Sequence, residues 1–368
     1  MNHQGLINQY RKFLPLNESA RVITLYEGQT PLLPLENIPL CLEKNIKIYA
    51  KFEGSNPTGS FKDRGMTVAI SQAVSEGARA VICASTGNTS ASAAAFAARA
   101  RIPCFVIIPS GKIALGKLAQ AMAHGAIVLK INGNFDAGMQ VVKDLADTNG
   151  LAIVNSINPF RLQGQKTAAF EVVDELGAAP DFHCLPVGNA GNISGYWMGY
   201  SEYAGERLAS TPQEMEYVIE KKIFKKPKML GYQASGAAPF IEKRRIDKPD
   251  TVATAIRIGA PQSKSLAEQA SLSSDGWFRM LSDDEILKNQ SILAEHEGIF
   301  CEPASAISFG GAIADIEEGK IPEGSTVVCT LTGHGLKDPD IILNSQSNKL
   351  LEVSSNREAV ANIISNYI

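Results

Sequence analysis

The sequence has no strong excess of either charge and no long apolar run, and these absences exclude several classes of protein. With 35 lysines and arginines against 38 acidic residues, it lacks the basic surface that nucleic-acid binding requires. Short basic clusters at 221–228 and near Lys243 are interpreted as solvated helix ends. No apolar run is long enough to span a bilayer, and the N-terminus lacks the features of a secretion signal. We therefore expect a cytoplasmic protein with neither a nucleic-acid nor a membrane partner.

Two further motif classes are missing from the sequence. None of the six cysteines belongs to a CxxC pair, so we expect a reducing compartment and no metal site. Four of the cysteines lie in short apolar runs and are interpreted as small core residues of buried strands: Cys83, Cys104, Cys184 and Cys329. The GxGxxG pattern with a downstream acidic residue is also absent, which argues against a Rossmann dinucleotide enzyme.

The sequence does contain an alternation of short β-branched runs with longer helical segments, which predicts an α/β fold with parallel sheets. Its 368 residues exceed the size at which one hydrophobic core usually stops growing, so we expect two closely packed lobes. A first series of strands is predicted at 80–85, 103–109, 126–131 and 151–156. A second series comprises a helix at 166–177, strands at 181–188, 227–234 and 325–333, and a charged helical segment at 211–226.

Two loops of small and hydroxyl residues lie where a predicted strand is followed by a helix. The first, ASTGNTSAS (84–92), can hold a carboxylate through its hydroxyls, Asn88 and the free N–H groups of a helix start, although a plain helix cap explains it equally well. The second, VGNAGNISG (187–195), can direct successive amide N–H groups at one phosphate, and a tight turn without a ligand is the alternative. Both loops follow strands, where an open α/β sheet binds its ligand.

The segment SNPTGSFKDRG (55–65) places Lys62 after a glycine-containing turn, at the predicted start of a helix. The helix dipole and apolar neighbours favour the neutral, nucleophilic amine, whereas the alternative is a surface lysine beside Asp63. In CTLTGHGLKD (329–338), Thr332 lies at a strand tip, where its hydroxyl can bond a ring nitrogen or only local backbone. A Schiff-base lysine, an anion loop, a phosphate loop and a strand-tip hydroxyl are together the parts of a pyridoxal 5′-phosphate site.

On these four segments the chain closely resembles the fold type II (tryptophan synthase β-like) family of pyridoxal-phosphate enzymes, and within it the threonine synthases. The resemblance extends from YEGQTPLLPL (26–35) to TGHGLKDP (332–339). It implies a two-lobed α/β architecture of open, twisted parallel sheets. The smaller lobe would comprise residues 51–156. The larger lobe, which would bind most of the cofactor, would comprise residues 1–50 and 157–368.

The resemblance also implies roles for individual residues. Lys62 would be joined covalently to the cofactor and act as general base and acid, Asn88 would bond the phenolic oxygen of the cofactor, and Thr332 would meet its pyridine nitrogen. The cofactor phosphate would be cradled by the amides of Gly188, Asn189, Ala190, Gly191 and Asn192. The substrate carboxylate would be bound by Ser85, Thr86 and Thr89, and the substrate phosphate by Asn155, Ser156 and Arg161. For Arg161, an ordinary surface arginine is the alternative.

The implied activity is that of a lyase that converts O-phospho-L-homoserine and water to L-threonine and phosphate, in a homodimer and without a metal. A related threonine or serine dehydratase is an alternative, although dehydratases lack the aspartate that here follows Lys62 as Asp63. A non-catalytic sensor that binds the cofactor or an amino acid is a second alternative. The residues by themselves leave these alternatives open.

Overall fold

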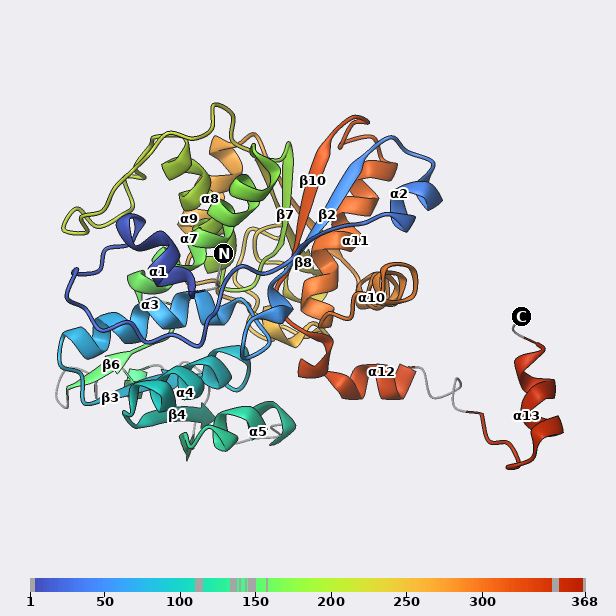
Figure 1. Ribbon diagram of the computed structural model, residues 1–368, viewed down its shortest axis with the longest axis horizontal. Coiled ribbons are helices and arrows are strands. Elements are labelled where there is room, and N and C mark those ends of the chain that lie inside the picture. Colours follow the sequence, from blue (N-terminus) through green and yellow to red (C-terminus); the bar gives the residue numbers. More distant parts are fainter. Residues whose placement is uncertain are drawn as a thin grey trace. The chain divides into compact units, whose positions relative to one another are not determined.

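Within the residues that the structure describes, ten strands form two separate sheets (Figure 1). The structure is a computed structural model that describes residues 4–109, 115–132, 138, 140–142, 144, 150–156, 158–345 and 351–366. Residues up to Lys337 form one compact unit, and Asp338–Ile368 form a second. The predicted α/β fold with parallel sheets is confirmed.

The four-stranded sheet has the order β5-β4-β3-β6, and all its strands are parallel. It contains the first predicted series, with strands at β3 (Ala80–Ala84), β4 (Cys104–Pro109), β5 (Ile127–Ile131) and β6 (Leu151–Ile153). Side chains alternate between its faces, so that Val81 and Cys83 pack into one buried cluster while Ile82 and Ala84 pack into another. The strand is buried on both faces, which explains its unbroken apolar run.

The six-stranded sheet has the order β1-β2-β10-β7-β8-β9, with only β1 antiparallel to its neighbour. Its strands are β1 (Leu32–Pro34), β2 (Lys47–Phe52), β7 (Phe182–Pro186), β8 (Lys228–Ala234), β9 (Phe278–Leu281) and β10 (Thr326–Leu331). The predicted strands of the second series are therefore confirmed. The strands β1, β2 and β9 were not predicted.

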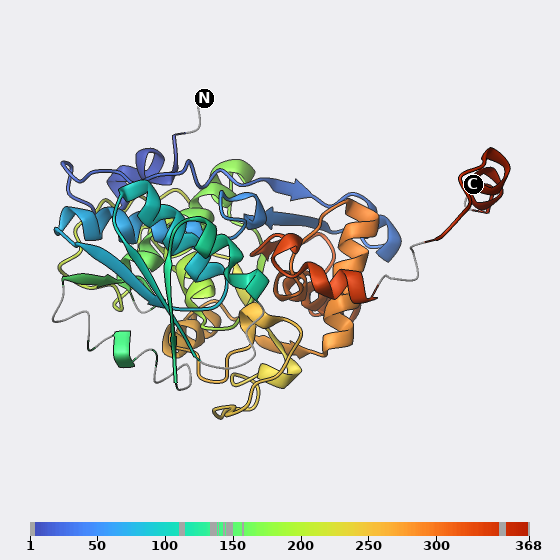
Figure 2. The ribbon, with the colours of Figure 1, turned by 90° about the horizontal axis from the view of Figure 1, so that it is seen from below.

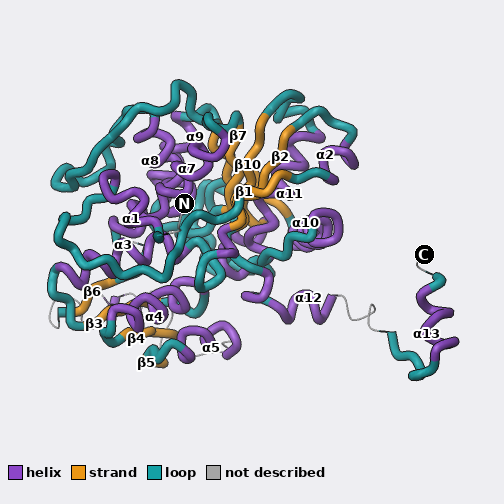
Figure 3. Tube along the Cα trace, viewed as in Figure 1, coloured by secondary structure: helices purple, strands orange, loops and turns teal. Residues whose placement is uncertain are grey.

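Helices cover both faces of the large sheet, and α3, α4 and α5 pack on one face of the small sheet (Figures 1 and 3). In Figures 1 and 2, α3 and α4 lie beside the small sheet, while α7, α8 and α9 lie on the opposite side of the large sheet from α10 and α11. The helices of the first unit are α1 (Leu6–Tyr10), α2 (Asn37–Leu42), α3 (Lys62–Ser75), α4 (Asn88–Ala100), α5 (Leu115–Ala123), α7 (Pro159–Leu176), α8 (Gly191–Tyr203), α9 (Lys264–Ser273), α10 (Asp283–Glu297) and α11 (Pro303–Glu317). The second unit contains α12 (Pro339–Ser345) and α13 (Arg357–Ile364).

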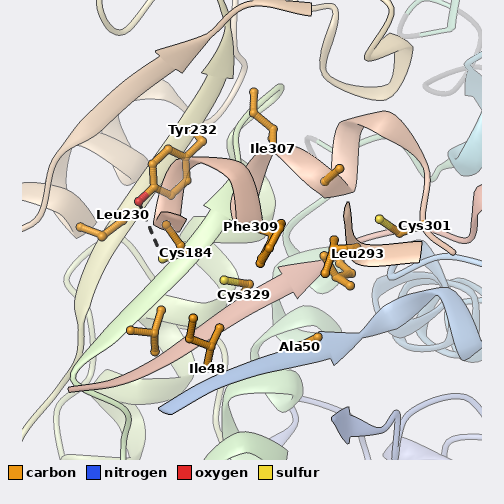
Figure 4. Close-up of a cluster of buried hydrophobic side chains, with 14 of the residues drawn as sticks. Ile48, Ala50, Cys184, Leu230, Tyr232, Leu293, Cys301, Ile307, Phe309 and Cys329 are labelled. Carbon is orange, nitrogen blue, oxygen red and sulfur yellow. Dashed lines mark hydrogen bonds between the residues drawn. The ribbon is translucent and has the colours of Figure 1, made fainter. Parts of the chain in front are cut away.

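The largest buried cluster lies between the large sheet and the helices α10 and α11 (Figure 4). Cys184 and Cys329 contribute to it from adjacent strands, and Phe309 packs on them from α11. All six cysteines are free thiols, and the four predicted as core residues are buried. Among the described residues, no helix combines the length and the apolar character needed to cross a membrane.

Helix α7 begins seven residues earlier than predicted, at Pro159 in place of Lys166. The Asn158 side chain caps it by accepting a hydrogen bond from the N–H of Phe160, and proline at the first helical position lacks only an N–H that would have no partner there. Gly164 does not end the helix, because it lies against α3, where a Cβ would come within 1.9 Å of the carbonyl oxygen of Arg64. A packing requirement therefore explains this glycine, and no local signal reveals it.

The helix predicted for 211–226 is wrong, because this segment runs as an irregular loop. The backbone N–H groups of Lys222 and Ile223 donate to the carbonyl of Tyr203, at distances of 2.6 and 2.9 Å. Amides that are bonded to another element cannot form the ladder of a helix. The basic cluster at 221–228 consequently leads into β8 and is not a helix end.

A fully buried network of charges joins β2, α3 and α7. The Arg64 guanidinium forms ion pairs with Glu53 at 2.6 Å and with Glu171 at 2.6 Å, and Lys51 pairs with Glu171 at 2.8 Å. The Thr30 hydroxyl donates a further hydrogen bond to the Glu53 carboxylate, at 2.7 Å. The neighbouring cations Arg64 and Lys51 outweigh the effect of burial and hold the pKa of Glu171 well below its usual range.

We predict that Arg64→Met lowers the free energy of unfolding by about 3–5 kcal/mol, because it leaves two carboxylates buried without their common partner. Urea unfolding followed by circular dichroism measures this loss. The exposed Arg79 is the matched control, since Arg79→Met is expected to change the value by no more than about 0.5 kcal/mol. A loss below about 1 kcal/mol for Arg64→Met would show that the network contributes little to stability.

Candidate functional site

The loops selected from the sequence lie at the switch points of the two sheets. In the small sheet the chain passes from β3 to β4 on one side, and it returns with β6 on the other side of β3. In the large sheet it passes from β7 to β8, and it returns with β10 on the other side of β7. Open α/β sheets bind ligands at such points, outside the carboxyl ends of the strands. The loops that follow these four strands contain Ser85–Thr89, Asn155–Ser156, Gly188–Ala190 and Thr332.

Lys62 is the first residue of α3, as predicted, and its turn is hydrogen-bonded to the loop that follows β10. The N–H of Phe61 donates to the carbonyl of Thr332 at 2.9 Å, and the N–H of His334 donates to the carbonyl of Gly59 at 3.0 Å. Gly59 has a φ of 80°, which favours glycine at this position. The structure thereby brings together the first and the last of the four segments, which are 270 residues apart in sequence.

The side-chain carboxylate of Asp63 stabilises the same turn. Its buried carboxylate accepts hydrogen bonds from the Thr58 N–H at 2.7 Å, the Thr58 hydroxyl at 2.6 Å and the Ser92 hydroxyl of α4 at 2.6 Å. Burial raises the pKa of Asp63, and these donors oppose the change. The aspartate after Lys62 therefore connects the turn to α4, and it is not the exposed partner of a surface lysine.

The Lys62 amine lies in a poorly solvated environment. Loss of solvation lowers its pKa to about 7, and the positive charge of Arg161 acts in the same direction while the carboxylate of Glu302 opposes it. The Nζ atom lies 4.3 Å from the centre of the Phe61 ring, and Lys62 forms no ion pair with any described residue. Near neutral pH about half of the amine is consequently uncharged, the form that attacks a carbonyl carbon.

The loop from 188 to 192 leads into α8 and contains no charged side chain. Ala190 adopts a left-handed conformation with φ of 66° directly before the first helical residue, Gly191. The first amides of α8 have no acceptor within the helix, so they are available to an anion. Gly188 packs against Ile256, whose Cα would lie 2.9 Å from an added Cβ, and the backbone can approach a ligand closely here.

The half-buried residues Ser85 and Thr86 follow β3 in the loop that leads into α4, and Asn88 and Thr89 are the first two residues of that helix. The side chain of Asn155 exchanges two hydrogen bonds with the backbone of Ala84, at 3.0 and 2.9 Å. Its amide therefore holds the ends of β3 and β6 together. The Ser156 hydroxyl donates to Gln262 at 2.7 Å.

Arg161 differs from the expectation for a surface arginine, because its side chain is fully buried. Its Nη1 donates to the carbonyl of Val154 at 2.6 Å, while Nε and Nη2 have no hydrogen-bond partner among the described residues. Burial lowers its pKa to about 10, which leaves it charged at neutral pH. The guanidinium lies against the first turn of α3, since a Cβ on Gly65 would come within 2.7 Å of Nε. Two buried, charged donors without a partner are the requirement for an anion site.

Sequence reasoning missed Glu302, which lies immediately before α11. Its buried carboxylate accepts hydrogen bonds from the Asn88 amide at 3.2 and 3.1 Å, and the Thr332 hydroxyl lies 3.5 Å away. It also missed Ser305, whose Oγ lies 2.9 Å from the Thr332 hydroxyl and accepts from the N–H of Gly333 at 2.8 Å. The only local signal was the start of a helix at Glu-Pro, which does not indicate a site.

The residues present fit pyridoxal 5′-phosphate. An uncharged amine at Lys62 can bind an aldehyde, and the start of α8 with its loop can bind a phosphate. Asn88 and Thr332, which come from different sheets, are connected through Glu302. These groups together could hold one flat ring between the two sheets.

Comparison with known proteins agrees with this fit. A family model described as "Pyridoxal-phosphate dependent enzyme" matches residues 23–333. The chain is 51% identical over 351 residues to a threonine synthase from Synechocystis sp., with 94% of this chain and 87% of the relative covered. It is 49% identical over 366 residues to a threonine synthase from Bacillus sp. (strain ULM1), with 100% and 99% covered.

A solved structure shares the fold at a much lower level of sequence identity. Maize serine racemase superposes with a TM-score of 0.73 and 19% identity, and the alignment covers 94% of this chain and 98% of the racemase. At this identity the similarity concerns the fold alone. It agrees with the predicted two-sheet, fold type II architecture.

We predict that the reactivity of Lys62 rises with pH and levels off just above pH 7, because the neutral amine is the reactive form and its pKa is about 7. Reductive methylation of the cofactor-free protein between pH 5.5 and 9.5, with mass spectrometry of the Lys62 peptide, measures the profile. The peptide with the exposed Lys243 provides the comparison. A Lys62 reactivity that still increases tenfold per unit above pH 8 would contradict the prediction.

Proposed function

The chain belongs to the pyridoxal-phosphate-dependent enzymes and, among them, to the threonine synthases, and we propose that it converts O-phospho-L-homoserine and water to L-threonine and phosphate. The observation that carries the choice of substrate is the buried Arg161, whose two unpartnered donors lie next to the first turn of α3. A substrate with its own phosphate needs a second anion site besides the phosphate loop at the start of α8. Arg161 supplies a fork of donors that matches a phosphate.

We assign the cofactor to the residues named from the resemblance. Lys62, the first residue of α3, would be its covalent attachment point, Asn88 would bond its phenolic oxygen and Thr332 its ring nitrogen. The amides of residues 188–192 bind its phosphate at the positive end of α8. Ser85, Thr86 and Thr89 bind the substrate carboxylate at the start of α4. Asn155 and Ser156 form the wall of the substrate phosphate site next to Arg161.

When bound, the cofactor supplies an electron sink for the charge that develops on the substrate carbon that loses its proton. The Lys62 amine takes that proton and returns one later, and its pKa of about 7 suits both directions near neutral pH. Arg161 binds the departing phosphate and compensates its charge as the bond to Cγ breaks. The rigid turn of residues 58–63 holds the amine in place, so little entropy is lost at the reacting carbon.

We also propose the larger-scale properties that the resemblance implies. The chain divides into a smaller lobe at 51–156 and a larger lobe made of 1–50 and 157–368, each containing one of the two sheets. It acts in the cytoplasm as a homodimer. The strand β2 supports the boundary near residue 51, because it ends at Phe52 in the large sheet directly before the turn that leads to Lys62.

We predict that the purified yellow protein releases phosphate and L-threonine from O-phospho-L-homoserine, and that borohydride reduction attaches the cofactor to Lys62. Lys62→Ala is expected to lose the reducible adduct and to lower kcat by at least about a thousandfold, since it removes both the attachment point and the general base. Lys243→Ala, at an exposed position, is the control. If the main product is pyruvate or 2-oxobutyrate, the protein is a dehydratase and the proposal is wrong. A protein that binds the cofactor but turns over none of these substrates is a sensor.

We predict that Arg161→Lys raises KM for O-phospho-L-homoserine by about 10- to 100-fold, because a lysine keeps the charge but loses the two-pronged donor. The affinity for pyridoxal 5′-phosphate is expected to change by less than threefold, since that phosphate lies at the other site. Steady-state kinetics and cofactor titration measure the two effects, with Arg79→Lys as the exposed control. An unchanged KM would remove Arg161 from the substrate phosphate site.

A further inference from the structure

A single carboxylate connects the two residues that are expected to bind opposite parts of the cofactor ring. Glu302 accepts from Asn88 of α4 with both oxygens, at 3.2 and 3.1 Å, and its Oε1 lies 3.5 Å from the Thr332 hydroxyl after β10. Asn88 follows the small sheet, whereas Glu302 and Thr332 are packed on the large sheet. The contact therefore joins groups that belong to different sheets.

The backbone around Glu302 leaves its side chain little freedom. Its N–H donates to the carbonyl of Gly333 at 3.0 Å, and a Cβ on Gly333 would come within 2.6 Å of the Glu302 carboxylate. The side chain is only 1% exposed. Glu302 precedes the first residue of α11, Pro303, but its side chain makes no capping hydrogen bond to that helix. The carboxylate thus points at the site, and capping does not explain why it is there.

The charges around Glu302 are mainly positive. Lys62 of α3 and Lys337, which follows β10, both interact with it; burial lowers the pKa of each lysine, and the negative charge of Glu302 opposes that change. Arg161 of α7 acts on Lys62 in the opposite direction, and Asp63 acts on Lys337 in the same direction as Glu302. The pKa of Lys62 therefore depends on one buried cation and one buried carboxylate, and replacement of either changes that pKa.

We propose that Glu302 is a positioning residue for the cofactor site, where it orients the Asn88 amide, supports the Thr332 hydroxyl and places a negative charge beside Lys62. The inference rests on the proposed function, because it takes Asn88 and Thr332 as cofactor ligands. A carboxylate can only accept hydrogen bonds, so the Asn88 NH₂ group directs one N–H at Glu302, and its second N–H is left for the phenolic oxygen of the cofactor. The amide orientation that the cofactor meets is consequently decided by Glu302 and not by Asn88 alone.

The test is Glu302→Gln in the cofactor-loaded protein, followed by two measurements that need no turnover. The dissociation constant for pyridoxal 5′-phosphate is expected to rise about tenfold, since a charge-assisted hydrogen bond is lost. The pH midpoint of the visible absorption band of the bound cofactor is expected to move to lower pH, because the charge that favours protonation at Lys62 is gone. A role in folding alone would lower the thermal midpoint without moving the midpoint of the spectrum.

Glu297→Gln is the matched control, because it makes the same chemical change five residues earlier. That carboxylate accepts the N–H groups of Asn37 and Ile38 at the start of α2, outside the site. It is expected to leave both the dissociation constant and the spectral midpoint unchanged. Wild-type turnover of O-phospho-L-homoserine tests the proposed function separately, so failure of one proposal can be told from failure of the other.

Two results would overturn the assignment of Glu302. One is a folded Glu302→Gln protein whose dissociation constant lies within twofold of wild type and whose spectral midpoint does not move. If Glu302→Gln is not soluble, Glu302→Asp gives the decision, since it retains the charge but shortens the reach to Asn88. We then expect weaker cofactor binding with an almost unchanged spectral midpoint, and wild-type affinity would overturn the proposal.

Discussion

The position of Lys62 depends on two backbone hydrogen bonds that join residues 59–61 to residues 332–334. They attach the start of α3, which packs beside the small sheet, to the end of β10 in the large sheet. Backbone bonds of this kind do not depend on side-chain rotamers, so the amine has a defined place relative to both sheets. Arg64 lies two residues further along α3, and its buried ion pairs hold the same helix to Glu53, directly after β2, and to α7. The site can bridge two sheets because both connections meet in one helix.

Electrostatics then give the fixed amine its chemistry. Burial and Arg161 favour the neutral form of Lys62, whereas Glu302 favours the charged form, and the result is a pKa of about 7. A group that titrates near neutral pH can both take and return a proton. The buried Arg161 also has two donors without a partner among the described residues, and the proposed substrate phosphate site rests on them. Arg161 therefore influences the pKa of the Lys62 amine and, in the proposed function, also binds the substrate phosphate.

The sequence predicted elements well where the signal was local, and it failed where tertiary contacts decided. The strands β3 and β4 follow from unbroken apolar runs, and β7, β8 and β10 from mainly apolar runs with few polar residues, because strands of a covered parallel sheet are buried on both faces. Residues 211–226 have a helical composition, but the N–H groups of Lys222 and Ile223 bond to Tyr203 and that of Val218 bonds to Lys12. The early start of α7 depends on its close contact with α3 at Gly164. Neither effect can be read from a window of a few residues.

The sequence by itself determined the fold class and the strands that precede the candidate ligand loops. It also indicated the four segments around Lys62, Asn88, Gly188 and Thr332, because glycines and small residues directly after a strand are typical of ligand loops in open α/β sheets. Only the tertiary structure decided that Arg161 is buried with unpartnered donors, that the Asn155 amide is hydrogen-bonded to the backbone of Ala84, and that Glu302 contacts both Asn88 and Thr332. Burial and the partners of a polar side chain are properties of the packed chain. They depend on residues hundreds of positions away, and no local pattern records them.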